Sequence, residues 1–568
     1  MKTEAIYHRM LSEMAYAVTD SVITIRIKTA KDDIKSVVLL YGDRSSRLDP
    51  IPLEKVVMQK VASDNVSDYF EATFSSLYNR ICYCFELRDT EGKVLYYSGS
   101  QFEKAPPAPR SEYFQIPYNH RADRIKVPSW MQDAIVYNIF PDSFATGKRT
   151  ILDKPLTFLE DGVEIKSLHG GTIGGIRENI DYFCSLGVNT IYLNPIFKAG
   201  EYHKYDTIDY FQVDPCFGSN EEFKTLVKEL HNNGLRIIID GVFNHAGWHF
   251  PPFRDVVKNG KRSKYWSWFY RLEEPVIIPD DWEKYPNYEC FGYERMMPKL
   301  ALDNKEVEDF FCRVGTFWVK EFDVDGWRLD VADEIPDAFW RRFRTEIKRV
   351  KPDCALIGEV WVNSSHWLDG SMFDSTMNYD VWRHAKRFFA SKDITSSEFD
   401  SRITDMRMRY CSQFVHSQMN LIDSHDVSRF FSLCGERYES YRLSIVFLFT
   451  FIGMPMLFYG DERGMKGIKE ADFRAVMSWD KKNDEAFNLF KNLIALRKSN
   501  EVLNSGEFRT IRVGDDGLYI YERVNDDDSI KIALNRNDYA IELHCDNILL
   551  QEGYEDKKLD VNGFVIYR

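Results

Sequence analysis

The fold is decided by residues 219–240, SNEEFKTLVKELHNNGLRIIID, which read as one helix followed by one buried strand. Ser219 and Glu222 form a capping-box pair, apolar residues then recur at helical spacing, and Gly234 supplies a stop. The strand candidate LRIIID is continuously apolar and carries the carboxylate of Asp240 at its end. Parallel strands that helices cover on both faces are expected to be apolar throughout. This unit therefore predicts a parallel α/β architecture.

Seven further apolar runs have the same character and alternate with helical segments. They are Ile135–Phe140, Thr190–Leu193, Gly326–Asp330, Ala355–Glu359, Met372–Ser375, Met419–Ile422 and Met454–Tyr459. With LRIIID they make eight strand candidates. Eight such units predict a fold of the (β/α)8 TIM-barrel type, with function at the C-terminal ends of the strands.

The two ends of the chain read as β structure without long amphipathic helices. Short β-branched runs such as Val22–Ile27 and Val37–Tyr41 predict an N-terminal β-sandwich domain over residues 1–124. The barrel is expected over 125–499, with an inserted, aromatic-rich subdomain at about 246–299, after the third strand. Short strands return after residue 500 and predict a C-terminal β domain over 500–568.

The composition excludes several classes of protein. Hydrophobic residues make up 44% and charged residues 29% of the 568, which is typical of globular proteins. The formal net charge of −14 argues against a general nucleic-acid or anionic-membrane binder, because phosphates attract cationic surfaces. It leaves neutral partners such as sugars open. The longest apolar run, Leu443–Tyr459, is short for a membrane span and contains Gly453 and Pro455.

The cysteines and the N-terminus favour a cytoplasmic location. The ten cysteines are scattered and include no C-x-x-C pair, so a secreted disulfide scaffold is not indicated. Charged residues interrupt the first eighteen residues, MKTEAIYHRMLSEMAYAV, where a signal peptide would need an apolar core.

Acidic residues recur where the strand candidates end. Asp240, Asp330 and Glu359 end or nearly end strands, and Asp426 lies just past another, with His245 and His425 nearby. A charged group is costly in a packed core but is expected at the mouth of a barrel, where catalytic groups gather. Any one of these carboxylates could be a solvated strand end or a helix cap, but together they predict an active site.

The neighbours of two carboxylates suggest different protonation states. Arg328 and Asp330 point to the same side of a strand, so the guanidinium is expected to favour ionised Asp330. The alternative interpretation is that Arg328 and Asp330 form a structural ion pair without a catalytic role. Glu359 lies between ALIG and Val360–Trp361, where partial desolvation is expected to raise its pKa and keep it protonated. One ionised and one protonated carboxyl are what glycoside hydrolysis requires.

Several motifs resemble those of one family. DGVFNH (240–245), GWRLDVADE (326–334), GEVW (358–361) and DSHD (423–426) resemble the four short blocks of the α-amylase superfamily, glycoside hydrolase family 13, in the family's order. MPKL (297–300) is similar to a block that marks its neopullulanase, cyclomaltodextrinase and maltogenic amylase group. GVNTIYLNPIF (187–197), HKYDTIDYF (203–211), GMPMLFYGDE (453–462) and YFEATF (69–74) match as well, so the resemblance covers almost the whole chain.

The resemblance implies a role for each matching residue. Asp330 would be the nucleophile, Glu359 the general acid and base, and Asp426 the third carboxylate at the cleavage subsite. Substrate binding would involve Tyr205, His245, Arg328, Glu334, Trp361, Tyr379 and His425. The implied reaction is a retaining double displacement, in which the two carboxyl groups lie about 5–5.5 Å apart. For Trp361 and Tyr379, ordinary packing is an equal alternative.

Two departures from the group's pattern narrow this expectation. Asp333 stands where members usually have Asn, and it adds a negative charge that could change the choice of acceptor. The group's calcium-binding segment here reads FATGKRT (144–150), and its partner position is Thr172. Lysine and arginine cannot coordinate a hard cation that requires oxygen ligands. We therefore expect no calcium at this site, and neither a metal nor a cofactor is predicted.

The resemblance implies an α-glucan hydrolase that acts on cyclodextrins, maltooligosaccharides and pullulan, with possible transglycosylation. Group members typically form homodimers. One alternative is an α-1,6 or α-1,4 exo-glucosidase of the same superfamily, with which Val331 after the nucleophile candidate is compatible. An alternative of another class is a non-catalytic glucan-binding protein, because fold alone does not guarantee activity.

Overall fold

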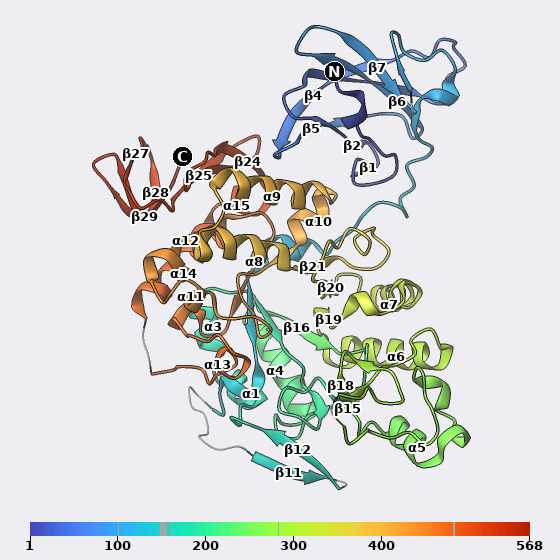
Figure 1. Cartoon of the computed structure of the whole chain (residues 1–568), viewed down its shortest axis with the longest axis vertical. Helices are drawn as coiled ribbons and strands as arrows, with labels where there is room; N and C mark the ends of the chain where they lie inside the picture. The colour runs from blue at the N-terminus through green and yellow to red at the C-terminus, as the bar shows by residue number, and fades with distance from the viewer. Residues whose placement is uncertain (100, 148–155, 161, 282, 481–482) are drawn as a thin grey trace. The chain divides into compact units, whose positions relative to one another are not determined.

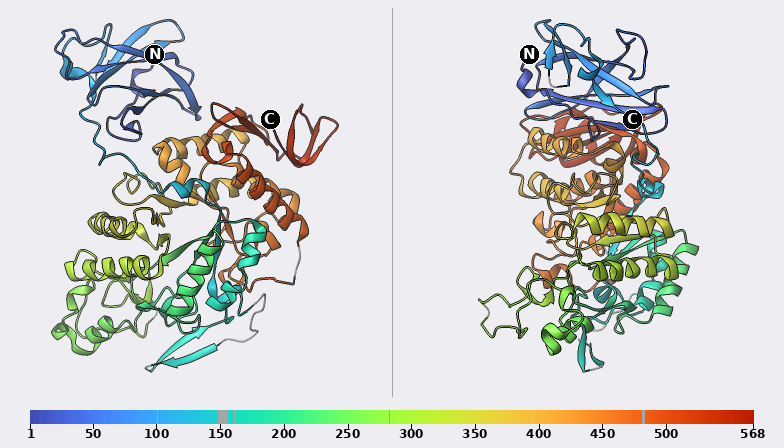
Figure 2. Two further views of the ribbon diagram at one scale, coloured as in Figure 1. Left: turned by 180° about the vertical axis from the view of Figure 1, so that it is seen from behind. Right: turned by 90° about the vertical axis from the view of Figure 1, so that its right-hand side faces the viewer.

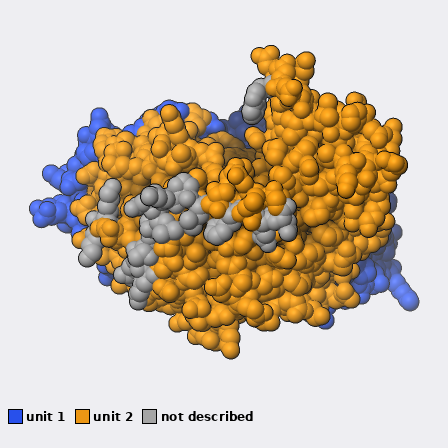
Figure 3. All heavy atoms as spheres, turned by 90° about the horizontal axis from the view of Figure 1, so that it is seen from below, with its two compact units in different colours: residues 1–126, 392–415, 506–568 blue, residues 127–391, 416–505 orange. Residues whose placement is uncertain are grey.

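A computed structural model describes residues 1–99, 101–147, 156–160, 162–281, 283–480 and 483–568. The chain divides into two compact units, which Figure 3 shows in different colours. The first comprises residues 1–126, 392–415 and 506–568, and the second comprises 127–391 and 416–505.

The second unit is built on a closed barrel of parallel strands, so the predicted TIM barrel is confirmed (Figure 1). The strands, in order around the barrel, are β10 (Val136–Ile139), β13 (Thr190–Leu193), β16 (Arg236–Gly241), β19 (Gly326–Leu329), β20 (Ala355–Gly358), β21 (Ser375–Asn378), β22 (Met419–Asn420) and β23 (Met454–Phe458). Strand β23 pairs with β10 and closes the ring. Alternate side chains, among them those of Tyr192, Ile238 and Ile357, fill the interior with a buried apolar cluster.

The helix and the strand predicted for residues 219–240 are both confirmed. Helix α4 spans Asn220–Asn232, and its N-terminus carries the reciprocal bonds of a capping box between Ser219 and Glu222. Its buried face consists of the apolar residues at helical spacing, and β16 follows.

The predicted sixth strand, Met372–Ser375, is wrong by three residues, because the strand is Ser375–Asn378. The ring of Phe373 packs against Gly358, outside the strand pairing. Asp374 accepts the backbone N–H of Leu356 and forms ion pairs with Arg344 and Lys348. The apolar run therefore belongs to the approach to the strand rather than to the strand itself.

Helices connect the barrel strands. The longer ones are α3 (Ile180–Leu186), α4, α6 (Lys305–Phe322), α7 (Asp337–Val350), α8 (Tyr379–Ala385), α12 (Tyr438–Thr450) and α14 (Asp484–Ser499). Figure 1 shows α6 and α7 side by side outside β19. Such helices cover the outward-facing side chains of the strands.

The predicted insertion follows the third barrel strand, β16. It contains α5 (Pro251–Asn259) and the short antiparallel pair β17 (Cys290–Phe291) and β18 (Glu294–Pro298). Two further hairpins, β11 (Leu156–Glu160) with β12 (Val163–Ser167) and β14 (Phe197–Ala199) with β15 (Thr207–Val213), lie in earlier connections. The β11–β12 hairpin projects away from the barrel (Figure 2).

The first unit contains two antiparallel β structures. Its N-terminal sheet is formed by β1 (Ala15–Ala17), β2 (Val22–Ala30), β3 (Ile34–Asp43), β4 (Glu54–Ser63), β5 (Ser67–Ser75), β6 (Ile81–Asp89), β7 (Val94–Ser98), β8 (Gln101–Glu103) and β9 (Phe114–Ile116). Its C-terminal sheet is formed by β24 (Glu507–Arg512), β25 (Leu518–Val524), β26 (Ser529–Asn535), β27 (Ile541–Glu542), β28 (Ile548–Glu555) and β29 (Lys558–Tyr567). Helix α9 (Ser396–Met408) belongs to the same unit. The β structure predicted for both ends of the chain is thus confirmed.

Among the described residues, no helix is both long enough and apolar enough to cross a membrane.

Candidate active site

The C-terminal ends of β19 and β20 hold two predicted catalytic carboxylates side by side. Asp330 directly follows β19 and Glu359 directly follows β20. Their backbone N–H groups donate to Gly241 and Leu329 on the neighbouring strands, which extends the parallel pairing to both residues. Both residues are about 95% buried. The positions of these carboxylates are therefore set by the barrel itself.

The chain turns sharply after Asp330. Val331 has φ of 44°, in the left-handed region that β-branched residues rarely adopt. Its N–H donates to Oε2 of Glu359 at 2.8 Å. The strained turn thus gives Glu359 a backbone donor, and strain of this kind is concentrated at functional sites.

Arg328 joins the carboxylates at the centre of the site. Its side chain is fully buried, and Nη1 donates to Oδ1 of Asp330 at 2.7 Å and to Oδ1 of Asp240 at 3.0 Å. Nη2 lies 2.8 Å from Oε1 of Glu359 in an ion pair that lacks hydrogen-bond geometry. A single cation therefore faces three buried carboxyl groups.

Burial, together with this excess of acidic groups, raises the pKa of both catalytic candidates. Burial raises the pKa of Asp330, and the charges of Glu359 and Asp240 add to it, although Arg328 opposes the shift. Burial also raises the pKa of Glu359, against the same opposition. Arg328 does favour ionised Asp330, as predicted, but the expectation that Asp330 therefore remains ionised is not met, because one guanidinium does not offset burial among several carboxyl groups. The pair is suited to share one proton between its two carboxyl groups.

Asp426 is the carboxylate that stays ionised. Burial alone would raise its pKa, but His425, Arg328 and Arg474 hold it well below its usual range. Nε2 of His425 lies 3.0 Å from Oδ2, and Nη2 of Arg474 lies 3.3 Å from Oδ1. Its side chain retains 22% exposure, so an ionised oxygen is accessible to sugar hydroxyls.

Tyr205 and His425 form one wall of the site. Their rings are parallel, with centroids 5.9 Å apart, and Tyr205 Oη lies 2.5 Å from His425 Nε2. The amide of Asn194 contacts Nδ1 of His425 at 2.9 Å and orients the imidazole. Tyr192 donates to Asp240, which in turn binds Arg328.

His245 presents an unused nitrogen. Its Nε2 is buried and has no hydrogen-bond partner among the described residues, while its ring stacks on Phe291 at 4.9 Å. Burial lowers the pKa of His245 to about 3, so the imidazole is neutral. A buried polar atom without a partner is costly, and a ligand hydroxyl could satisfy it.

Trp361 and Tyr379 are stacked on each other. Their rings are nearly parallel, with centroids 3.7 Å apart, and Nε1 of Trp361 donates to Oε1 of Glu359 at 3.1 Å. Tyr379 is almost fully buried. Tyr379 thus acts as a packing surface for Trp361, and Trp361 is the member of the pair that touches a catalytic candidate.

Glu334 lies at the exposed rim rather than among the buried carboxylates. Nζ of Lys299 lies 2.8 Å from its Oε2 and also contacts the amide oxygen of Asn244. A β-bridge between His245 and Lys299 brings the MPKL block beside DGVFNH. A cavity of about 430 Å³ adjoins the pair and is lined by Tyr270, Arg271, Tyr285, Glu289, Cys290, Gly292, Lys299 and Glu334. Burial raises the pKa of the neighbouring Asp333.

Comparisons with known proteins agree with this geometry. A family model described as "Alpha amylase, catalytic domain" matches residues 138–482, and one described as "Alpha amylase, N-terminal ig-like domain" matches 1–120. The chain belongs to the α-amylase family. A cyclomaltodextrinase from Geobacillus thermopakistaniensis is 39% identical over 96% of this chain and 92% of its own length. Neopullulanase 2 from Thermoactinomyces vulgaris is 37% identical over 94% and 91%. A solved cyclomaltodextrinase structure superposes with a TM-score of 0.91 at 33% identity and covers both chains completely.

This α-amylase-family chain is thus a retaining glycoside hydrolase of the cyclomaltodextrinase, maltogenic amylase and neopullulanase type, as the motifs predicted.

Sequence reasoning missed three supporting residues. Asn194 directly follows a barrel strand, so the rule that located the carboxylates could have found it. Lys299 lies within the MPKL motif (297–300), but the sequence analysis assigned no role to this lysine. Arg474 follows the short helix α13 (Glu470–Phe473), and no sequence signal connects it with Asp426.

The structure describes part of the region on which the calcium expectation depends. Thr172 caps helix α2 (Ile173–Arg177) by accepting the N–H of Gly175, and its hydroxyl donates to the carbonyl of Thr146. Lys148, Arg149 and Thr150, on which the expectation of no calcium depends, lie outside the described residues. Among the residues that are described, no three His, Cys, Asp or Glu side chains form a metal-binding group.

Proposed function

We propose that the chain cleaves the α-1,4 bonds of cyclodextrins, maltooligosaccharides and pullulan, with some transglycosylation. The observation that carries the reaction is the contact of Arg328 with both Asp330 and Glu359, at 2.7 and 2.8 Å. It brings two carboxyl groups to one buried point, as a double displacement requires. The substrates are those in the names of the relatives, a cyclomaltodextrinase and a neopullulanase.

In this proposal each buried group has one task. Asp330 attacks the anomeric carbon and forms the glycosyl-enzyme, while Glu359 protonates the departing oxygen and later deprotonates water. Asp426 accepts hydrogen bonds from sugar hydroxyls, and the unpartnered Nε2 of His245 donates one. Arg328 and His425 orient the carboxylates, and Tyr205 and Trp361 supply apolar faces for the rings.

The rim is suited to the acceptor. Glu334, held by Lys299, faces a cavity with the two tyrosines Tyr270 and Tyr285 among its lining residues. Aromatic faces and a few fixed polar groups are the features of a sugar site. An incoming glucan that binds there would compete with water for the glycosyl-enzyme.

A product analysis tests the proposal. We expect γ-cyclodextrin and pullulan to be cleaved faster than soluble starch, and panose to be released from pullulan. Glucose as the only product would instead identify an α-1,6 or α-1,4 exo-glucosidase. Equal turnover by the wild type and Asp330→Asn would contradict the assignment of Asp330 as the nucleophile. Absence of turnover by the wild type would instead leave a non-catalytic glucan-binding protein as the interpretation.

The partner and the location are also proposals. We propose a homodimer, for which light scattering on the purified chain is the direct measurement. We propose a cytoplasmic location, which the ten free thiols support, because a reducing compartment keeps cysteines unpaired.

A further inference from the structure

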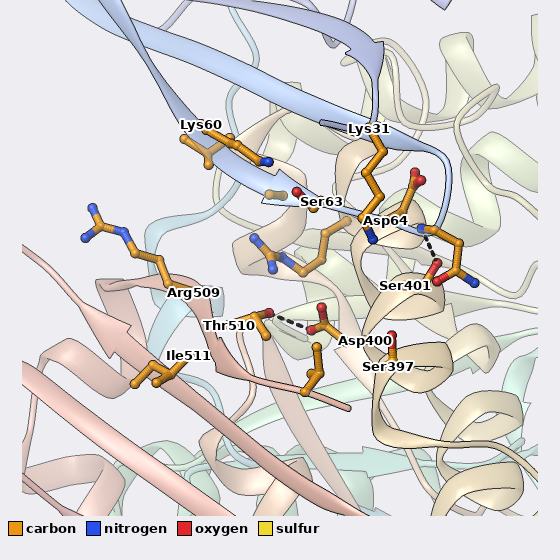
Figure 4. A pocket seen from close by; sticks show the side chains of 15 residues that line it. Lys31, Lys60, Ser63, Asp64, Ser397, Asp400, Ser401, Arg509, Thr510 and Ile511 are labelled. Atoms are coloured by element: carbon orange, nitrogen blue, oxygen red, sulfur yellow. Dashed lines mark hydrogen bonds between the residues drawn. The ribbon is translucent and has the colours of Figure 1, made fainter. Parts of the chain in front are cut away.

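The first unit contains a cavity of about 420 Å³ that is not part of the active site. Strand β4 and the turn after β2 form one side, helix α9 a second, and strand β24 a third (Figure 4). Its lining residues are Lys31, Lys60, Val61, Ala62, Ser63, Asp64, Asn65, Ser397, Asp400, Ser401, Arg407, Arg509, Thr510, Ile511 and Val513.

Four cations line this cavity, although the chain as a whole carries a net charge of −14. Lys60 is paired with Asp68 at 2.8 Å. In the part of the chain that the structure describes, the side chains of Lys31 and Arg509 form no ion pair. Figure 4 shows Lys31 and Lys60 extending from the strands toward the space above Asp400. The cavity therefore concentrates positive charge.

Arg407 is the most deeply buried of the four cations that line the cavity. It is 96% buried, and its Nη2 donates to the carbonyl of Phe508. Its Nε is buried without a hydrogen-bond partner among the described residues. Burial lowers the pKa of Arg407, since the nearby acidic groups do not compensate it fully. A buried cation whose charge is only partly balanced is costly, and an anionic ligand would reduce that cost.

The two carboxylates of the lining are already occupied. Asp64 accepts the N–H groups of Val66 and Ser67 and the hydroxyl of Tyr69. Asp400 accepts the hydroxyls of Thr510 and Tyr519, and its burial raises its pKa. Neither carboxylate forms an ion pair with Arg407 or Lys31 in the described part of the chain. The cationic groups are thus left for an incoming ligand.

The lining also indicates the chemistry of that ligand. It contains no aromatic residue, so it lacks the apolar platform that a neutral glucan would need. It does contain the hydroxyls of Ser397 and Ser401 on one face of α9. Guanidinium, ammonium and hydroxyl groups are the donors that bind phosphate oxygens.

We propose that this cavity binds a small phosphate-bearing ligand, through Arg407 and Lys31. Two sources share this chemistry, inorganic phosphate and a phosphorylated sugar. The proposal is independent of the active site, since every lining residue belongs to the first unit.

Calorimetric titration of the full-length chain tests it, with inorganic phosphate, glucose 6-phosphate and uncharged glucose as probes. We expect both phosphates to bind at low ionic strength and added salt to weaken them, while glucose gives no salt-dependent binding. Equal affinities would identify free phosphate as the ligand. Tighter binding of glucose 6-phosphate would identify a sugar phosphate.

The variants Lys31→Gln and Arg407→Gln should each weaken phosphate binding about tenfold, because each removes a charged donor. Lys35→Gln is the matched control, an exposed lysine four residues further on that does not line the cavity. Thermal unfolding checks that Arg407→Gln still folds, and Lys31→Gln carries the test if it does not. Absence of phosphate binding by the wild type, or unchanged affinity in Lys31→Gln, would overturn the proposal.

Discussion

Arg328 and Glu359 form a buried ion pair in which Nη2 and Oε1 lie 2.8 Å apart without hydrogen-bond geometry. The guanidinium commits Nη1 to Asp330 and Asp240 instead. Arg328 therefore influences the charge of Glu359 without a hydrogen bond to its carboxyl, whose oxygens accept only the N–H groups of Val331 and Trp361 among the described residues. A proton donor to the leaving group must be able to exchange its proton.

Replacement of Arg328 should change the pH profile as well as the rate. Arg328 opposes the raised pKa of Asp330 and Glu359, so its loss raises both pKa values further. The pair then takes up a second proton at higher pH, and the acid limb of kcat in Arg328→Met moves toward alkaline pH. Arg328→Lys keeps the charge and should keep the limb near that of the wild type. Identical acid limbs in wild type and Arg328→Met would contradict this role.

The two carboxylates should respond differently to a substrate that needs no proton to leave. Glu359→Gln is expected to lose about 10²–10⁴-fold in kcat on γ-cyclodextrin, the usual contribution of a general acid. With α-maltosyl fluoride it should still release a rapid burst of fluoride, because fluoride departs unprotonated. Asp330→Asn should lose activity on both substrates and show no burst. A burst from Asp330→Asn would mean that the nucleophile is another residue.

Lys299 and Glu334 should act as one unit in the choice between water and a glucan acceptor. Their contact of 2.8 Å holds a carboxylate whose side chain is 47% exposed. Lys299→Met and Glu334→Gln should each change the ratio of transfer to hydrolysis. The double variant should then change it no more than the larger single effect, because contacting residues are not additive. Product chromatography measures this ratio. Fully additive effects would show that Lys299 and Glu334 act independently.

The burial of His8 leads us to expect that the first unit loses stability at acidic pH. Burial lowers the pKa of His8 from 6.5 to about 4, and its ring nitrogens contact the carbonyl of Arg26 and the hydroxyl of Tyr83. The folded state thus favours the neutral ring. Its contribution is complete above pH 6.5 and is lost as the pH falls from 6.5 through 4, by about 3 kcal/mol.

Chemical denaturation at pH 7 and pH 4.5 measures this contribution. His8→Gln should be less stable than the wild type at pH 7 and lose less stability on acidification. The exposed His120, in the same unit, provides the control His120→Gln. An unchanged pH dependence in His8→Gln would assign the acid sensitivity to other groups.

Chelation should leave the enzyme active. Thr172 already uses its oxygen to cap α2 and to bind Thr146, and lysine and arginine side chains of the 144–150 segment supply no oxygen ligand. We expect excess EDTA to change neither turnover of γ-cyclodextrin nor the unfolding temperature. Loss of activity that added calcium restores would show that the expectation is wrong.

The barrel was predictable from sequence because its signals are local. The capping box of α4 and the continuous apolarity of β16 each act within a few residues. The shifted sixth strand shows the limit of this reasoning. Phe373 is as apolar as a strand residue but packs against Gly358, and only the tertiary structure distinguishes the two.

The catalytic candidates were predictable from their places at strand ends, and so was the raised pKa of Glu359 from its apolar neighbours, but the raised pKa of Asp330 was not. The effect of Arg328 on Asp330 depends on how many other carboxyl groups share the guanidinium, and Asp240 comes from a strand almost ninety residues earlier. The contact of Arg474 with Asp426 likewise joins residues 48 positions apart, which lie on opposite sides of the last barrel strand in the sequence. Long-range pairs of this kind carry no sequence pattern.

The composition of the first unit from three separated pieces has a consequence for synthesis on the ribosome. The N-terminal sheet has its own apolar core and can form early, but Asp400 and Arg407 of α9 find their partners Thr510 and Phe508 only in the last piece of the chain. Until translation nears its end, this acid and this base cannot be buried against their partners and must remain hydrated. A nascent chain that stops short of residue 506 would therefore lack more than its final sheet, since part of an earlier helix would lose the groups that make its burial tolerable.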